Sequence, residues 1–263
     1  MDTPKRGPFD LSGKDIWVFG GAGYLGQPVV RLLHELGATV LCVDLGERSK
    51  TFIDEASLSP NVTAATLDVS DCEALDTFVQ SQIQERNVPH GLVNLTFAST
   101  AKRMEDLSVA EFDQVNHTGL TSTFVLTRAV GEQMAQQKRG SIVSFSSMYG
   151  VVSPNPEVYQ SPMNKNPLEY GVGKAGIIQM TKYMAVHWGK RNVRCNCISP
   201  GPFPNPTVQQ TYPDFVERLA EKSPMGRVGK ADEIAGSVAF LLSDAATYIT
   251  GHNLMVDGGW TSW

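Results

Sequence analysis

The stretch that decides the fold is IWVFGGAGYLG, residues 16–26. Its apolar first part predicts a buried strand, and its glycines form a turn that leads into a helix. That helix carries apolar side chains from Val29 to Leu36 and ends at Gly37. A second buried strand is expected over residues 39–43, which completes one βαβ unit.

The same alternation continues along the chain. Apolar runs and helix-like segments follow one another from residue 16 to about residue 240, which is typical of a parallel sheet wound with helices. Further strands are expected over residues 92–95, 141–145 and 193–198, and a further helix begins near residue 70. A chain of 263 residues fits one α/β domain. We therefore predict an α/β fold, a Rossmann-like doubly wound parallel sheet in a single domain.

Composition and charge narrow the classes of function. The formal net charge of −5 and the lack of a stripe rich in Lys and Arg argue against a nucleic-acid partner. No apolar run approaches the roughly 18 residues of a membrane span, and the first ten residues lack the apolar core of a signal peptide. No membrane and a cytoplasmic location are therefore expected. The cysteines, Cys42, Cys72, Cys195 and Cys197, are scattered, so we expect reduced thiols and no metal site.

The glycine turn predicts a dinucleotide site. Its glycines let the backbone approach a diphosphate, which then lies at the positive end of a helix. Asp44 ends the second strand, 18 residues after Gly26, where a carboxylate bonds both hydroxyls of the adenosine ribose and repels a 2′-phosphate. NAD is therefore expected rather than NADP. Arg48, the one nearby cation, is expected to be a solvated loop residue.

A pair of side chains predicts proton transfer. Tyr170 and Lys174 lie four residues apart in an apolar, helix-like stretch, so both lie on one face of that helix. An unperturbed tyrosine has a pKa of about 10, which is too high for efficient proton exchange at neutral pH. A nearby ammonium and the positive charge of oxidised nicotinamide favour the phenolate, so a lowered pKa of Tyr170 is expected.

With these features the chain resembles the short-chain dehydrogenase/reductase family, specifically its single-domain branch. The resemblance runs from about residue 11 to residue 260. It is carried by ordered landmarks: the glycine turn, residues 67–69, 115–116 and 140–147, Tyr170 with Lys174, and residues 197–201 and 249–259. Members of this branch commonly assemble as tetramers, so the resemblance implies a homo-oligomer, either a tetramer or a dimer.

The resemblance also implies the roles of individual residues. Tyr170 donates or accepts the proton, while Lys174 lowers its pKa and holds the nicotinamide ribose. Ser147 polarises the substrate oxygen, and Asn116 holds a water that connects Lys174 to solvent. The cofactor-binding residues implied are Gly20, Gly23, Tyr24, Leu25, Gly26, Asp44, Asp68, Val69, Asn94, Tyr170, Lys174, Pro200, Gly201 and Phe203.

The chain departs from the family pattern at the glycine turn and at one strand end. The turn has Phe19 where Thr is usual, and Tyr24 stands in place of its second glycine. The strand end that is usually Asn-Asn-Ala-Gly is Asn94-Leu-Thr-Phe97, without the small residues that let backbone approach a cofactor.

Three further segments are set apart from the common core. Residues 148–169, between the serine and the tyrosine, form an insertion that is expected to be a wall of the substrate cleft. Residues 200–224 are expected to form a lid, and residues 1–10 a flexible N-terminal arm ahead of a single domain over residues 11–263.

The function expected is that of an NAD(H)-dependent oxidoreductase that interconverts a secondary alcohol and a ketone on a small-molecule substrate. The polar content of residues 148–169 favours a sugar or activated sugar, and residues 147–170 look like those of family members tied to surface-glycan and flagellin-glycan pathways. Three alternatives stay open: a reductase of 3-oxoacyl thioesters or other ketones, a non-catalytic NAD-binding sensor or scaffold, and a nucleotide-sugar epimerase or dehydratase, against which the chain length argues.

Overall fold

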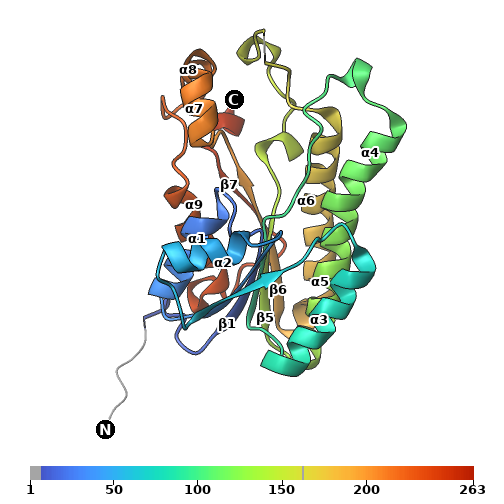
Figure 1. Cartoon of the computed structure of the whole chain (residues 1–263), viewed down its shortest axis with the longest axis vertical. Coiled ribbons are helices and arrows are strands. Elements are labelled where there is room, and N and C mark those ends of the chain that lie inside the picture. Colours follow the sequence, from blue (N-terminus) through green and yellow to red (C-terminus); the bar gives the residue numbers. More distant parts are fainter. Residues whose placement is uncertain (1–6, 162) are drawn as a thin grey trace.

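A parallel sheet of seven strands forms the centre of the molecule (Figure 1). The computed structural model describes residues 7–161 and 163–263, so the first six residues of the expected arm lie outside the described residues. The strands follow the order β3-β2-β1-β4-β5-β6-β7 across the sheet. Their bounds are β1 Asp15–Phe19, β2 Thr39–Asp44, β3 Val62–Thr66, β4 Gly91–Asn94, β5 Gly140–Phe145, β6 Val193–Pro200 and β7 Asn253–Val256.

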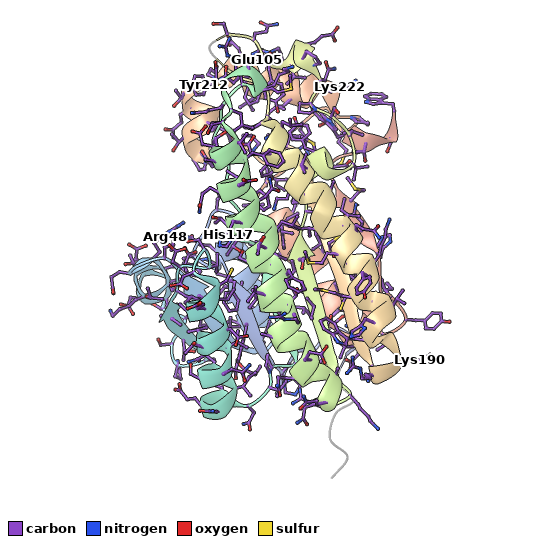
Figure 2. The ribbon with its side chains drawn as sticks, turned by 90° about the vertical axis from the view of Figure 1, so that its right-hand side faces the viewer. Arg48, Glu105, His117, Lys190, Tyr212 and Lys222 are labelled. Carbon is purple, nitrogen blue, oxygen red and sulfur yellow. The ribbon has the colours of Figure 1, made fainter. Side chains whose placement is uncertain are left out.

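Helices cover both faces of this sheet, which confirms the predicted doubly wound α/β fold in a single domain. Helices α1, α2 and α9 lie on one face and α3 to α6 on the other (Figure 1), and Figure 2 views the second layer. Helices α7 and α8 extend beyond the sheet near the C-terminus. The bounds are α1 Gly26–Glu35, α2 Arg48–Glu55, α3 Cys72–Arg86, α4 Val109–Asn116, α5 Ser122–Gln136, α6 Leu168–Trp188, α7 Pro206–Thr211, α8 Pro213–Lys222 and α9 Asp232–Leu242.

The first strand shows why an apolar run becomes a central strand. Successive side chains of a strand point to opposite faces, so Ile16 and Val18 enter the core under α1 and α9, whereas Trp17 and Phe19 enter the core under α3, α5 and α6. All four side chains are at most 1% exposed. A strand that is buried on both faces needs a continuous apolar run rather than an alternating one.

Local signals set where the helices begin and end. The side chain of Asp71 accepts hydrogen bonds from the N–H groups of Glu73 and Ala74 at 3.1 and 2.9 Å, which starts α3 where the sequence predicts a helix. Gly37 follows α1 with a φ of +86°, a left-handed conformation that favours glycine.

The two outermost strands and helix α2 are among the elements that were not individually predicted from the sequence. Strand β3 (VTAAT) and strand β7 (NLMV) are the edges of the sheet, and each is too short and too mixed in polarity to give a clear apolar run. Helix α2 consists mainly of polar residues, with only Ser49, Phe52 and Ile53 buried, so its periodicity is weak. These elements are identified by what they pack against rather than by their own sequences.

The strand order reverses between β1 and β4, which places their carboxyl ends beside each other at the crevice where open α/β sheets bind ligands. The glycine turn follows β1, and residues 95–97 follow β4. In the part of the chain that the structure describes, no helix is long and apolar enough to cross a membrane.

Candidate active site

The glycine turn brings backbone groups close together ahead of α1. A Cβ atom on Gly26 would lie 2.2 Å from the carbonyl oxygen of Gly20 and 2.8 Å from the backbone of Gly21, so a side chain does not fit there. In the described part of the chain, the N–H groups of Tyr24 and Leu25, just before the helix, make no hydrogen bond. Free N–H groups at a helix N-terminus suit a diphosphate.

Asp44 connects the second strand to this turn. One oxygen of its buried carboxylate accepts a hydrogen bond from the N–H of Ala22 at 3.0 Å, and the other accepts one from the N–H of Leu45 at 2.9 Å. Arg48 begins α2, and its guanidinium lies 3.1 Å from the same carboxylate. The prediction that Arg48 is a solvated loop residue is therefore wrong: its side chain is 56% exposed but is paired with the acid.

A cavity of about 280 Å³ opens over these groups. Five of the predicted cofactor residues line it: Gly20, Gly23, Asp44, Asp68 and Val69. Sequence reasoning missed other lining residues, namely Val43, Leu45, Arg48, Leu67, Leu95, Thr96, Phe97 and Thr118. Most of these directly follow strands β2 to β4. The carboxyl ends of these parallel strands lie at the same edge of the sheet, and this shared position is the signal that could have identified them.

Other predicted cofactor residues do not reach this cavity. The amide of Asn94 donates to the hydroxyl of Thr123 at 2.9 Å and accepts from the N–H and hydroxyl of Thr96, so its bonds hold the end of β4. Tyr24 turns toward α9, where its hydroxyl bonds the backbone of Ala231, and burial raises the pKa of Tyr24. Leu25 packs against the core, and Gly26 acts through its lack of a side chain.

Ser147, Tyr170 and Lys174 meet beside the carboxyl end of β5. Ser147 follows β5, and its hydroxyl bonds the side chain of Tyr170 and accepts from the N–H of Tyr149 at 3.1 Å. Tyr170 and Lys174 occupy one face of α6, as their spacing predicted, with the Lys174 ammonium 5.4 Å from the centre of the Tyr170 ring. That ammonium donates to the carbonyl oxygen of Phe145 at 2.7 Å.

Burial controls the protonation of this pair. It raises the pKa of Tyr170, and the hydrogen bond with Ser147 opposes the rise. Burial also lowers the pKa of Lys174 to about 7. The lowered pKa expected for Tyr170 is thus not found, because loss of water destabilises the phenolate more than its neighbours stabilise it.

Asn116 lies at the end of α4, with its amide nitrogen donating to the carbonyl of Phe112 at 3.0 Å. Its buried amide oxygen has no partner among the described residues. That oxygen lies near Gly173 of α6, where a Cβ atom would be 2.9 Å away. No direct hydrogen bond between Asn116 and Lys174 is found within the described residues, so a relay between them needs a bridging group.

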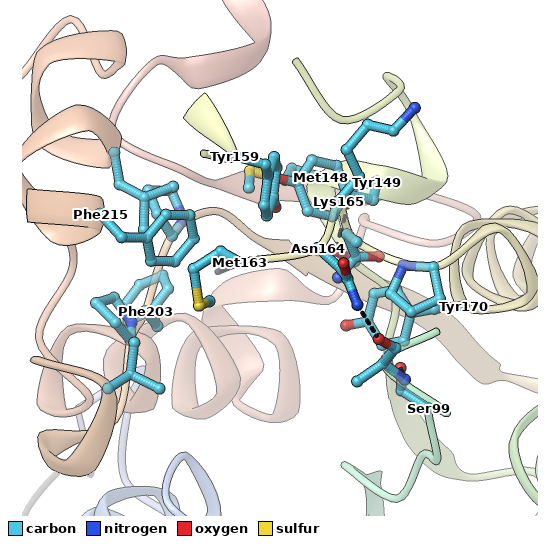
Figure 3. A pocket seen from close by; sticks show the side chains of 18 of the residues that line it. Ser99, Met148, Tyr149, Tyr159, Met163, Asn164, Lys165, Tyr170, Phe203 and Phe215 are labelled. Atoms are coloured by element: carbon cyan, nitrogen blue, oxygen red, sulfur yellow. Dashed lines mark hydrogen bonds between the residues drawn. The ribbon is translucent and has the colours of Figure 1, made fainter. Parts of the chain in front are cut away.

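A second cavity, of about 560 Å³, holds Ser147 and Tyr170 in its wall. Figure 3 shows two unlike ends: Phe203, Phe215 and Met163 at one, and Ser99, Asn164 and Tyr170 at the other. Gly201 and Phe203, which the resemblance implies for the cofactor, line this cavity, whereas Pro200 does not. Among its described lining residues Lys165 alone is charged.

The insertion and the expected lid pack together over this cavity. The rings of Tyr159 and Phe215 lie 5.3 Å apart, and the guanidinium of Arg218 on α8 donates to the carbonyl of Val158 at 2.9 Å. Tyr149 and Tyr159, at the two ends of the insertion's first half, share a hydrogen bond of 2.5 Å. Met148, Tyr149, Tyr159 and residues 163–167 of the insertion therefore line the cavity next to Tyr170.

The chain matches the model of the family described as enoyl-(acyl carrier protein) reductase over residues 21–261. It is 31% identical to a 3-oxoacyl-(acyl-carrier-protein) reductase of Thermotoga maritima, covering 95% of this chain and 98% of the relative. It is also 31% identical to a 7alpha-hydroxysteroid dehydrogenase of Bacteroides fragilis, with 95% of each chain covered. A D-arabinitol 2-dehydrogenase of Scheffersomyces stipitis is 30% identical, with 97% of this chain and 96% of the relative covered.

Solved structures with the same fold contain nicotinamide dinucleotides of both kinds. A short-chain dehydrogenase from Leptospira borgpetersenii with bound NAD+ is 30% identical, with a TM-score of 0.87 and coverage of 99% of this chain and 98% of that one. A structure described as an NAD(P)-dependent gluconate 5-dehydrogenase from Beutenbergia cavernae, with bound NADP, is 27% identical, with a TM-score of 0.86 and coverage of 98% and 100%.

Proposed function

Because the chain belongs to the short-chain dehydrogenase/reductase family, whose members interconvert alcohols and carbonyl compounds with a nicotinamide dinucleotide, we propose that it is an NAD(H)-dependent oxidoreductase of secondary alcohols and ketones. The observation that carries the proposal is the position of Tyr170. Its ring lies in the wall of the larger cavity, and its hydroxyl bonds Ser147. Lys174 lies one helical turn away, beside Phe97, which lines the smaller cavity at the glycine turn, here named the nucleotide cavity.

Each of these residues has a separate role in the proposed reaction. The cofactor, when bound, supplies the hydride acceptor or donor. Ser147 donates a hydrogen bond to the substrate oxygen, and Tyr170 takes the hydroxyl proton during oxidation or returns it during reduction. When Lys174 is protonated, its positive charge favours the phenolate of Tyr170. The free N–H groups of Tyr24 and Leu25 bind the diphosphate.

We infer a preference for NAD from the Asp44 carboxylate, and the pairing with Arg48 gives a direct test. Asp44→Asn removes the negative charge but keeps an acceptor for the N–H of Ala22. We expect NAD binding to weaken about tenfold, since bonds to charged groups contribute about 1.5–3 kcal/mol. We expect NADP binding to strengthen, because Arg48 is released from its partner and the phosphate is no longer repelled. Dissociation constants from NADH and NADPH fluorescence measure both effects.

Arg48→Leu provides the matched control. Alone, Arg48→Leu should leave the affinity for NAD within a few-fold of the wild-type value. Combined with Asp44→Asn, it should cancel the gain in affinity for NADP. A wild-type protein that already prefers NADP would contradict the assignment of Asp44.

We infer a polar, sugar-like substrate that carries a negative charge, such as an activated sugar or a sugar acid. Support comes from polar residues that line the larger cavity, namely Ser99, Asn164, Asn166 and the exposed Lys165. Lys165 makes no ion pair within the described part of the chain. A relative described as a D-arabinitol dehydrogenase acts on a polyol.

The charge of Lys165 can be tested by substitution. Lys165→Met should raise KM for an anionic sugar substrate roughly fivefold, because a partly solvated ion pair contributes up to about 1 kcal/mol. KM for a neutral polyol and for NAD should stay unchanged. Lys190→Met, in the turn that follows the far end of α6 (Figure 2), is the matched control and should affect neither KM value. Equal KM values for the anionic substrate in both variants would remove Lys165 from the substrate site.

A second candidate substrate is a ketone with an apolar body, such as a 3-oxoacyl thioester. The apolar end of the cavity, with Met163, Phe203 and Phe215, favours it, and one relative is described as a reductase of that class. Screening NAD reduction and NADH oxidation against sugars, sugar phosphates, polyols, acyl thioesters and steroid ketones separates the two. Cofactor binding without turnover of any of these would instead favour a sensor or scaffold.

A homotetramer or homodimer also belongs to the proposal. Phe124 of α5 and Tyr183 and Val186 of α6 are exposed apolar side chains on one helical layer, with Val186 85% exposed. Trp263 at the C-terminus is also 70% exposed, whereas Trp260 is buried within the chain. Light scattering on the purified protein measures the assembly.

A further inference from the structure

Phe97 lies between the two cavities of the site. It lines the nucleotide cavity, while its ring meets the ring of Tyr170, which lines the other cavity. The two ring centres are 5.1 Å apart and the planes are at 79°, so the rings meet edge to face. This arrangement is favourable for aromatic pairs and fixes one ring relative to the other.

Two glycines make the space that the Phe97 ring occupies. A Cβ atom on Gly119 would lie 2.3 Å from the ring, and one on Gly173 would lie 2.6 Å from it. Neither glycine has a left-handed backbone conformation, so the backbone does not require glycine at either position. The Phe97 ring therefore fits a slot between these two helical segments, and the absence of a Cβ atom at Gly173 also leaves room for the amide oxygen of Asn116.

The face of the same ring covers the Lys174 ammonium. The nitrogen lies 4.1 Å from the ring centre, and Lys174 is only 3% exposed. In the described part of the chain this ammonium makes one hydrogen bond, to the carbonyl of Phe145, although it carries three donors. An electron-rich ring face stabilises a cation most strongly where water is excluded. The ring thus replaces part of the solvation that burial removes.

We propose that Phe97 is a positioning residue of the catalytic site, whose face holds the Lys174 ammonium and whose edge-to-face contact orients the Tyr170 ring, in a slot provided by Gly119 and Gly173. The inference rests on the proposed function only for the roles of Tyr170 and Lys174. This role explains why Phe97 stands after β4, where the family usually has a small residue.

Four other titratable side chains lie around this pair, in addition to the Lys174 ammonium at 5.4 Å from the centre of the Tyr170 ring. Burial raises the pKa of Cys197, on β6 near Lys174, to about 11, and it also raises the pKa of Tyr149 and Tyr159, which face Tyr170. The carboxylate of Glu169 accepts from the N–H and hydroxyl of Thr100. Loss of the ring should therefore favour neutral Lys174 and, through it, protonated Tyr170.

The test is Phe97→Leu, which keeps an apolar side chain and removes the ring. We expect the pH at which alcohol oxidation is half-maximal to rise by about one unit, with NADH affinity within threefold of wild type. Phe203→Leu, which removes a ring from the larger cavity without touching Lys174, should change KM and leave the pH profile in place. An unchanged pH profile for Phe97→Leu, with tighter NADH binding, would overturn the proposal, since the ring would then only obstruct the cofactor.

A second measurement does not depend on turnover. The ionisation of Tyr170, followed as the phenolate absorbance that is lost in Tyr170→Phe, should move to higher pH in Phe97→Leu by a similar amount. If no alcohol is oxidised by the wild type, the proposed function fails while this titration still tests the ring. An unmoved titration would overturn the positioning role.

The slot itself is tested by a double-mutant cycle. Gly119→Ala should lower Tm and turnover in the wild type, because the three atoms nearest to the new methyl group all belong to the Phe97 ring, and it should be tolerated in the Phe97→Ala background. Additive effects of the two substitutions would show that the glycine does not serve the ring.

Discussion

Tyr170→Phe is expected to lower kcat by about 10²–10⁴-fold, the usual contribution of a positioned proton-transfer group. The substitution removes only the hydroxyl that bonds Ser147, while the ring keeps its edge-to-face contact with Phe97. NADH affinity and Tm should therefore stay close to wild-type values. Steady-state rates at several pH values, with NADH binding measured in parallel, provide the check.

Ser147→Ala is the matched comparison, because it removes the other partner of the same hydrogen bond. It should also lower kcat, but it should leave the phenolate titration of Tyr170 visible. Retention of a large fraction of kcat in Tyr170→Phe would end the assignment of this residue.

Lys174→Met should lower kcat by at least about 10²-fold, because Tyr170 loses the nearby positive charge. It should also weaken NADH binding, since we assign the ammonium to the nicotinamide ribose. The ammonium is replaced by an apolar group of similar length, so the core around Phe145 and Phe97 stays filled. Lys182→Met, two turns further along α6, is a control in which both quantities should stay unchanged.

We also expect the stability of Lys174→Met, compared with that of the wild type, to depend on pH. Burial lowers the pKa of Lys174 to about 7, against about 10.5 in an unfolded chain. Between these values the unfolded chain binds more protons than the folded one, so this group makes the wild type more stable as pH rises from 7 toward 10. The stability of Lys174→Met relative to wild type should therefore be greatest below pH 7 and should decline above it. A difference in Tm that does not vary with pH would contradict the lowered pKa.

The sequence predicts the fold well where one local pattern is sufficient. The strand, glycine turn and helix over residues 16–36 occur as expected, and the helix expected near residue 70 begins at Cys72 after the Asp71 cap. The two edge strands were missed because their short segments depend on neighbouring strands for pairing. The spacing of Tyr170 and Lys174 predicted a shared helical face because it depends only on helix geometry.

The sequence gives less information about contacts between distant segments. Phe97 was noted only as a departure from small residues, since its partners Gly119, Gly173 and Lys174 come from segments that meet only in the folded chain. The pairing of Arg48 with Asp44 depends on a polar helix without a clear pattern. The apolar end of the larger cavity is built partly by α8, so the polar composition of residues 148–169 alone did not reveal it.

Transfer of deuterium tests the central claim most directly. The protein is incubated with NADH deuterated at C4 on either face and with the panel of sugars, sugar phosphates, acyl thioesters and steroid ketones, and the products are analysed by mass spectrometry. We predict that one class of ketone gains a single deuterium on the former carbonyl carbon, from one face of the cofactor only, and that Tyr170→Phe abolishes this gain. NADH binding with no deuterium in any product would contradict the account.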